Sequence, residues 1–199
     1  SGANLIVFAS DVSIVIPTSA LPALNDATGE TTIRGRDTFV AVAGTLAGAG
    51  ADGLTLASSY NQIEGLYIYG YDGNGVVISG DYNIIGVDGD GTNDAAEHNV
   101  IGGNDLAGIK LTSTANNNRI AGNWIGLKIT GETYANFDGI ELGGSGNRIG
   151  VLGNGISDDL EGNVISGNLG EGIEVIANNN TIAGNTIGAN PAGTGKMAN

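Results

Sequence analysis

The sequence of 199 residues contains no cysteine, only three prolines, one tryptophan and one histidine. Without cysteine, the chain can form neither disulfide bonds nor thiolate metal sites. The single histidine, His98, has no second histidine for a metal site and no obvious serine to activate. A chain of this composition depends on packing and hydrogen bonding alone for its stability.

Basic residues are also scarce, with seven Lys and Arg against 21 Asp and Glu, which gives a formal charge of −14. This charge excludes nucleic acid and anionic membrane surfaces as partners. A cation, a basic surface or a neutral polysaccharide remains as a partner. The sequence contains no run of 18 apolar residues, so no membrane insertion is expected.

From Gly75 onward the sequence repeats itself at a spacing of 64 residues. Gly75–Ile78 returns as Gly139–Leu142, and Asn83–Gly86 returns as Asn147–Gly150. A fixed period of this size without a helical pattern indicates a solenoid. Each period holds two copies of a shorter unit, in which a Gly precedes an alternating apolar stretch and two Asn-x-Ile motifs follow.

Each unit predicts one coil of three short strands, in which Ile, Leu and Val recur at equivalent inward positions. The first-strand column is Leu56, Ile78, Leu111, Leu142 and Val175. The second is Ile63, Ile85, Ile120, Ile149 and Ile182, and the third is Ile68, Ile101, Ile125, Ile165 and Ile187. Stacked about 4.8 Å apart, these columns form a continuous dry core. The predicted fold is all-β, a parallel β-helix of about six to seven coils.

Asparagine precedes most of the second and third strands, although it is normally depleted in strands. At a tight turn its side chain can hydrogen-bond backbone groups and, in a stack, the asparagines above and below. A structural ladder is therefore predicted, with ligand binding as the alternative. Its members are Asn83, Asn99, Asn118, Asn123, Asn147, Asn163, Asn180 and Asn185.

The repeat also predicts the domain organisation, one β-helix domain over residues 1–199. Residues 1–52 form irregular N-terminal coils, with strands expected at Leu5–Phe8, Ser13–Ile16, Thr31–Gly35 and Phe39–Val42. Residues 53–74 form a short coil, and residues 75–138 and 139–199 are the two copies of the two-coil repeat.

The motif Asn118-Arg119-Ile120-Ala121-Gly122-Asn123, which is Asn-x-Ile-x-Gly-Asn, carries a family resemblance. On this motif and its copies the chain resembles the right-handed parallel β-helix repeat proteins of bacteria, with the pectate-lyase-like architecture. The resemblance implies a right-handed, single-stranded β-helix. Together with the acidity and the richness in Asn, Gly and Thr, it implies an extracellular or cell-surface location.

The same architecture hosts lyases, hydrolases, epimerases, adhesins and fibres, so the fold does not settle the activity. Catalysis needs a cluster of charged side chains on one outward face, and the outward columns show no complete cluster. Asp158-Asp159 is the only Asp-Asp pair and lacks the Gly-His-Gly segment of polygalacturonase-like enzymes. No catalytic residue is predicted, and a polysaccharide lyase or hydrolase is the least favoured function.

The loop after Gly86 is the best candidate for a site, because it alternates oxygen donors with glycines. This spacing allows a chain to wrap a hard cation such as Ca²⁺. An ordinary acidic surface turn is the alternative, and calcium is the only cofactor considered. The predicted metal ligands are Asp88, Asp90, Asn93, Asp94 and Glu97.

Outward-facing aromatic and basic residues suggest a ligand surface, which could stack sugars or orient a carboxylate. Packing under loops, or a solvated face for the two arginines, is the alternative for these positions. Lys110 and Glu141 are expected to form an exposed cross-strand ion pair. The predicted surface comprises Trp124, Arg119, Arg148, Tyr67 and Tyr69.

Neither terminal segment has the pattern of a capping helix, although solenoids usually protect their end coils. The expected function is therefore an extracellular structural protein that stacks head to tail into a filament, sheath or fibre. A stalk or carbohydrate-binding segment of a larger adhesin is the alternative. The partners considered are a second copy of the chain and polysaccharide.

Overall fold

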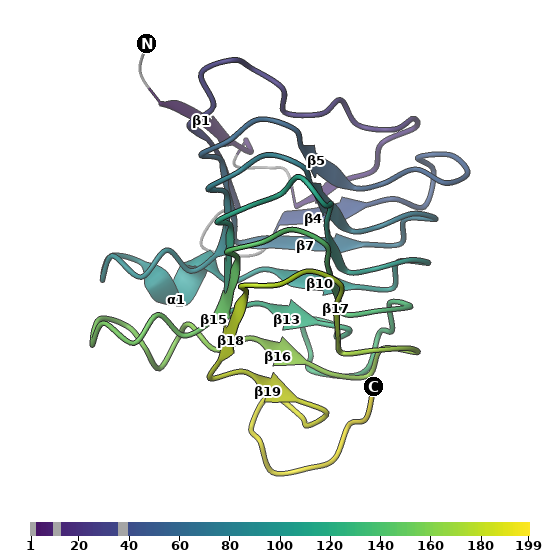
Figure 1. The fold of residues 1–199 in the computed structure, drawn as a ribbon. Coiled ribbons are helices and arrows are strands. Elements are labelled where there is room, and N and C mark those ends of the chain that lie inside the picture. The colour runs from purple at the N-terminus through teal and green to yellow at the C-terminus, as the bar shows by residue number, and fades with distance from the viewer. Residues whose placement is uncertain (1–2, 10–12, 36–39) are drawn as a thin grey trace.

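The computed structural model describes residues 3–9, 13–35 and 40–199, which form a parallel β-solenoid (Figure 1). Three parallel sheets, of seven, seven and five strands, run along the stack. Five coils contribute one short strand to each sheet, and the first and last coils contribute strands to sheets A and B, so the predicted all-β parallel solenoid of six to seven coils is confirmed. The expected strand residue Phe39 lies outside the described residues.

The strands of the three sheets follow each other in the order A, B, C around every coil. Sheet A contains β1 (Asn4–Val7), β3 (Thr31–Arg34), β6 (Gln62–Glu64), β9 (Ile84–Gly86), β12 (Arg119–Ala121), β15 (Arg148–Gly150) and β18 (Thr181–Ala183). Sheet B contains β2 (Ile14–Val15), β4 (Val40–Ala43), β7 (Leu66–Tyr69), β10 (Val100–Gly102), β13 (Trp124–Ile125), β16 (Val164–Ile165) and β19 (Thr186–Ile187). Sheet C contains β5 (Leu54–Leu56), β8 (Val76–Ile78), β11 (Ile109–Leu111), β14 (Ile140–Leu142) and β17 (Ile173–Val175), and an isolated bridge from Leu24 to Leu56 extends it.

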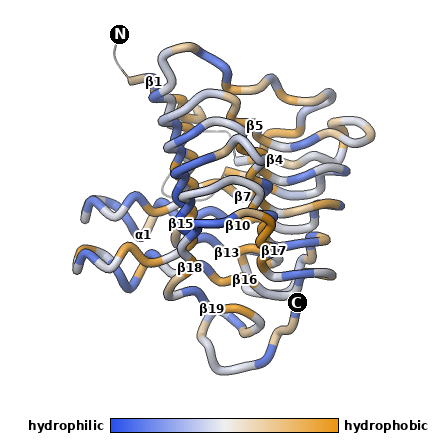
Figure 2. The backbone as a smooth tube through the Cα atoms, in the orientation of Figure 1, coloured by the Kyte–Doolittle hydropathy of each residue, from blue (hydrophilic) through white to orange (hydrophobic). Residues whose placement is uncertain are grey.

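The register of the strands places equivalent residues directly above one another. One column of sheet A consists of isoleucine in all seven coils, from Ile6 at one end to Ile182 at the other. Alternating residues point inward and outward, so hydrophilic and hydrophobic positions alternate around each coil (Figure 2). The inward residues of the middle coils are fully buried and form the core.

Asparagine ladders run along the corners of the stack. In each rung the backbone N–H, usually with the side-chain amide, donates to the Oδ1 of the asparagine in the next coil. Asn83, for example, donates to Asn118 Oδ1 from its backbone nitrogen at 2.7 Å and from Nδ2 at 3.1 Å. One ladder runs through Asn61, Asn83, Asn118, Asn147 and Asn180, and another through Asn99, Asn123, Asn163 and Asn185.

A third ladder, which the sequence analysis missed, follows the corner after sheet B. It runs through Asn104, Asn136, Asn168 and Asn199. Because buried backbone groups need partners, these side chains satisfy N–H groups that face the interior at the turns.

The core is covered in the middle of the stack but exposed at its end coils. Ile182 is 41% exposed and Val175 is 51% exposed, whereas their neighbours one coil earlier, Ile149 and Leu142, are fully buried. At the other end Ile6 is 44% exposed. Within the described residues, no helix is long and apolar enough to cross a bilayer.

Candidate metal centre and adjacent groove

Two long loops, residues 87–98 and 151–162, project from the corner between sheets A and B, on the side of α1 (Asp94–Glu97) (Figure 1). They are equivalent copies, 64 residues apart. In each copy a buried Glu carboxylate accepts a hydrogen bond from the backbone N–H at the second position of the loop. Glu97 binds the N–H of Asp88 at 3.0 Å, and Glu161 binds the N–H of Leu152.

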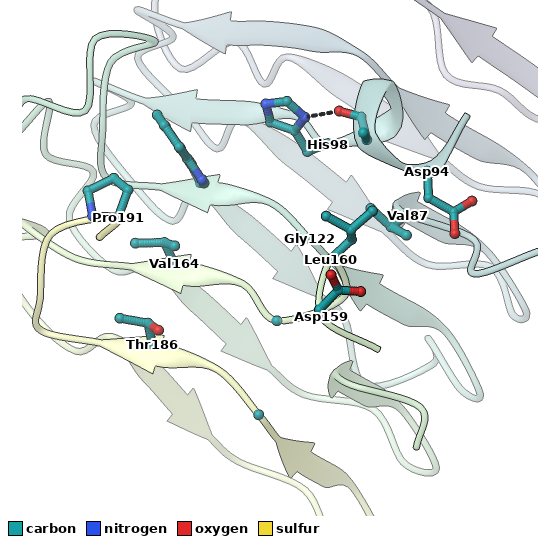
Figure 3. Close-up of a pocket in the computed structure, with 13 residues that line it drawn as sticks. Val87, Asp94, His98, Gly122, Asp159, Leu160, Val164, Thr186 and Pro191 are labelled. Atoms are coloured by element: carbon teal, nitrogen blue, oxygen red, sulfur yellow. Dashed lines mark hydrogen bonds between the residues drawn. The ribbon is translucent and has the colours of Figure 1, made fainter. Parts of the chain in front are cut away.

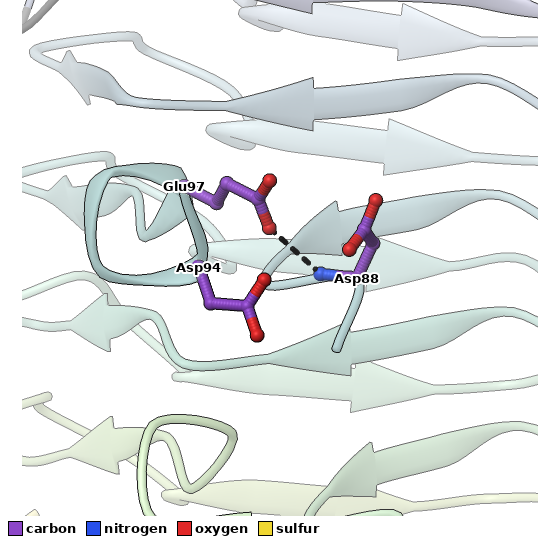
Figure 4. Close-up of side chains that lie close together, drawn as sticks. All are labelled: Asp88, Asp94 and Glu97. Atoms are coloured by element: carbon purple, nitrogen blue, oxygen red, sulfur yellow. Dashed lines mark hydrogen bonds between the residues drawn. The ribbon is translucent and has the colours of Figure 1, made fainter. Parts of the chain in front are cut away.

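The first loop gathers three carboxylates at its base. Asp88, Asp94 and Glu97 each offer an oxygen, and these oxygens all lie within 4.8 Å of one another (Figure 4). The turn of α1 places Asp94 and Glu97 three residues apart, on one side of the helix, where Asp88 meets them. In the part of the chain that the structure describes, this is the one group of three metal-binding side chains.

Of the other two predicted ligands, Asp90 is not a member of this group, and Asn93 lies directly before α1. Asp90 is exposed, and its carboxylate accepts a hydrogen bond from the N–H of Thr92 at 2.6 Å. Asn93 adopts a left-handed conformation, with φ of 64°, at the start of α1. Both residues shape the turn, which is the ordinary role of Asp and Asn in loops.

The carboxylate group is held in an unfavourable electrostatic environment. Burial, together with the charges of Asp88, Glu64 and Asp94, raises the pKa of Glu97 to about 7, although the hydrogen bond from Asp88 N–H acts to lower it. Asp94 is only 4% exposed, and its Oδ1 has no hydrogen-bond partner in the described part of the chain. Its other oxygen accepts a bond from Gly91 N–H at 3.3 Å.

In the second loop, the equivalent carboxylates are paired with groups of the protein itself. Glu161, which is fully buried, forms an ion pair with Arg119, and Leu152 replaces Asp88. The Asp94 equivalent, Asp158, uses both oxygens to accept bonds, from Gly153 N–H at 3.1 Å and from Gly155 N–H at 3.0 Å. The second loop therefore pairs its acidic groups with internal donors.

The outward arginines hold the two loops in place. Arg119 and Arg148 are neighbours in sheet A, as the repeat predicts. Arg119 pairs with Glu161 and donates to the carbonyl oxygen of Asp88, and its side chain is only 13% exposed. Arg148 donates to the carbonyl oxygens of Val151 and Leu152. The solvated face considered for the two arginines is corrected, because each guanidinium is engaged by a loop.

The predicted aromatic positions lie on sheet B, away from the arginines. Tyr67 and Tyr69 contact each other, with ring centroids 4.5 Å apart, and Tyr134 lies 6.0 Å from Tyr69. Burial raises the pKa of Tyr67 to about 12, together with the nearby Tyr134 and Tyr69. The five residues predicted as one ligand surface therefore occupy two different faces. The predicted Lys110–Glu141 ion pair is present at 2.8 Å.

A groove of about 370 Å³ runs between the loops over sheet B (Figure 3). Trp124, Val164 and Thr186, from three successive strands, form its floor. His98 lies beside Trp124, with ring centroids 6.1 Å apart, and the His98 Nδ1 contacts the carbonyl oxygen of Ala95 at 3.0 Å. Burial lowers the pKa of His98, which favours its neutral form. The remaining lining includes Asp94, Asp159, Leu160 and Pro191.

Comparison with protein-family models, with curated proteins and with solved structures gave no match for this chain.

Proposed function

We propose that the protein is an extracellular structural β-solenoid whose copies stack head to tail into a filament, sheath or surface fibre. The observation that carries this proposal is the exposed core at both end coils. Ile6 and Ile182 terminate the same isoleucine column, and both are more than 40% exposed. The burial of large apolar residues is the main driving force for association.

The two end coils are complementary as well as apolar. Strands β1 and β18 are the edge strands of one parallel sheet, so β18 of one copy can pair with β1 of the next in the register of the stack. Asn4 and Asn180 occupy equivalent positions at the starts of these strands. In a stack, the N–H of Asn180 would donate to Asn4 of the next copy and continue the ladder.

The finer assignment, to the bacterial right-handed β-helix repeat proteins of the pectate-lyase-like architecture, is part of this proposal. It is supported by the Asn-x-Ile-x-Gly-Asn motif and by the parallel solenoid that the motif forms. An extracellular location is supported by the acidic composition and by its richness in Asn, Gly and Thr.

Electron microscopy and sedimentation velocity test the stacking. The wild type is expected to form rods that lengthen with concentration, with an axial repeat of about 34 Å for seven coils at about 4.8 Å each. Ile182→Asp places a charge in the contact and should leave single short rods. The control is Leu106→Asp, which changes an exposed leucine on the side of the stack.

A wild-type protein that remains a monomer at high concentration contradicts the stacking. It would point to the alternative, in which further coils of a longer surface adhesin cover the same surface. Assembly that Leu106→Asp abolishes as completely as Ile182→Asp also contradicts the proposal.

The groove on sheet B supports a second candidate function, the binding of a neutral polysaccharide. Trp124 offers an aromatic face on the floor, and Asp159 offers polar contacts at the wall. Glycan-array binding should be lost in Trp124→Ala and retained in Tyr82→Ala, which changes an exposed tyrosine stacked on Tyr60. Release of shortened chains from a bound glycan would instead indicate a lyase or hydrolase.

A further inference from the structure

The geometry points to a Ca²⁺ site formed by the carboxylates of Asp88, Asp94 and Glu97, at the base of the loop 87–98. The site lies on the side of the stack, between α1 and the end of strand β9 (Figure 4). It is therefore independent of the end-to-end contact proposed above.

The negative charges of the three carboxylates are not compensated by basic side chains among the described residues. Within the described residues, none of the three carboxylates takes part in an ion pair. The nearest further acidic group, Glu64, is already engaged by Arg34 and by Gln62. Three carboxylates this close repel each other unless a cation lies between them, because buried charge needs a partner.

One carboxylate oxygen of Asp94 indicates a missing ligand. Asp94 is 96% buried, and among the residues that the structure describes its Oδ1 has no hydrogen-bond partner. Buried polar atoms in folded proteins are almost always satisfied, so an orphaned carboxylate oxygen indicates a missing ligand. Figure 4 shows the Asp94 carboxylate extending between α1 and Asp88. In the second loop the equivalent atom of Asp158 is satisfied by Gly153 N–H at 3.1 Å.

The chemistry of the ligand atoms indicates which cation the site binds. All the offered ligands are carboxylate oxygens, which suit hard cations, and the group contains no nitrogen or sulfur donor that would favour zinc. Ligands on opposite sides of Ca²⁺, at about 2.4 Å each, lie about 4.8 Å apart. The three oxygens lie within 4.8 Å of one another, so one Ca²⁺ can contact all of them, and Ca²⁺ tolerates the irregular ligand geometry of a loop, whereas Mg²⁺ demands a near-ideal octahedron.

The second loop has no carboxylate at the position equivalent to Asp88. Leu152 stands in its place, and Arg119 neutralises the remaining glutamate. The carboxylates of the first loop therefore suit a bound cation, whereas in the second loop the Arg119 guanidinium provides the positive charge. This makes the second loop a matched control for the first.

Calorimetric titration of chelator-treated protein with CaCl₂ tests the site. We expect one Ca²⁺ per chain, with a Kd of about 10⁻⁴–10⁻³ M, as in extracellular calcium modules. At a hundredfold excess over the Kd, the Tm should rise by about 5 °C or more. Asp94→Asn should weaken binding at least tenfold, because it removes one charge of the site. Asp158→Asn, the same change in the second loop, should leave binding unchanged.

Asp88→Leu provides a second variant, because Leu152 shows that leucine is tolerated at this position of the loop. It should also weaken Ca²⁺ binding at least tenfold, while the circular dichroism of the chelator-treated protein stays that of the wild type. The proposal is overturned if the wild type shows neither heat nor a Tm shift with CaCl₂. It is also overturned if Asp158→Asn loses as much affinity as Asp94→Asn, or if MgCl₂ binds as tightly as CaCl₂.

Discussion

The loops 87–98 and 151–162 occupy equivalent positions of the repeat, yet they balance their charges in opposite ways. Both keep the buried glutamate that accepts a hydrogen bond from the N–H at the second position of the loop. The coil that precedes each loop makes the difference. Arg119 stands in the coil before the second loop, and Gln62 stands at the same column position before the first. In a solenoid, therefore, the function of a repeated loop depends on its neighbour in the stack.

The largest effect is expected from breaking the ion pair of the second loop. Arg119→Met leaves the buried Glu161 without its oppositely charged partner, which should lower the free energy of unfolding by about 3–5 kcal/mol. Arg148→Met, in the next coil, removes only hydrogen bonds to carbonyl oxygens and should cost about 1 kcal/mol. Urea unfolding followed by circular dichroism measures both values. Equal losses would show that the ion pair does not distinguish the two positions.

The core should show the next largest contrast between the copies. Leu111→Ala empties a fully buried position in the middle of the stack and should cost about 2–5 kcal/mol. Val175→Ala, 64 residues later in the same column, changes a half-exposed residue and should cost about 1 kcal/mol or less. The measurement is urea unfolding at a concentration where the protein is monomeric. A Val175→Ala loss as large as that of Leu111→Ala would indicate that another coil covers the end.

A smaller contrast is expected along the first asparagine ladder. Asn118→Ala leaves the backbone N–H and the side-chain amide of Asn83 without their acceptor in the interior, which should cost about 2–3 kcal/mol. Asn180→Ala, at the half-exposed end of the ladder, should cost about 1 kcal/mol, because water can replace the lost bond. Thermal unfolding of the two variants measures the difference. A reversed order would contradict the role of the ladder in satisfying buried N–H groups.

The smallest effect is expected from exchanging Asp88 and Leu152, which occupy equivalent positions at the start of the two loops. In chelator, Asp88→Leu should raise the free energy of unfolding by about 0.5–1 kcal/mol, because it relieves repulsion within the carboxylate group. Leu152→Asp should lower it by a similar amount, because it adds a carboxylate beside Glu161. Parallel urea titrations measure both. A loss of stability in Asp88→Leu without calcium would show that the three carboxylates do not repel each other.

The spacing of 64 residues and the alternation within each unit were sufficient to predict the coils. Because side chains alternate across a strand, positions such as Ile120 and Ile149 could be assigned to one inward column, and the structure pairs them. The third ladder was missed because Asn104 and Asn136 lie in loops that do not share the Asn-x-Ile motif. The sequence contained a signal for it, since Asn104, Asn136 and Asn168 recur at a spacing of 32 residues.

The candidate site was predicted only in part. Alternating Asp and Gly pointed to the right loop, but the sequence could not tell which of five donors converge. Asp90 and Asn93 shape the turn, whereas Asp94 and Glu97 meet Asp88 because a short helix follows. The groove over Trp124 was not predicted, because its walls come from loops about 60 residues apart.

The sequence by itself determined the architecture, because a period-2 pattern repeated at a fixed spacing can bury its apolar face only by stacking coil on coil. The tertiary structure alone decided the charge balance. Whether a carboxylate is paired depends on the residue 4.8 Å away in the next coil, which lies 40 or more positions distant along the chain for Glu161 and Arg119. Local sequence patterns determine where each strand forms and which of its residues point inward. The partners of charged side chains are determined only when the coils stack.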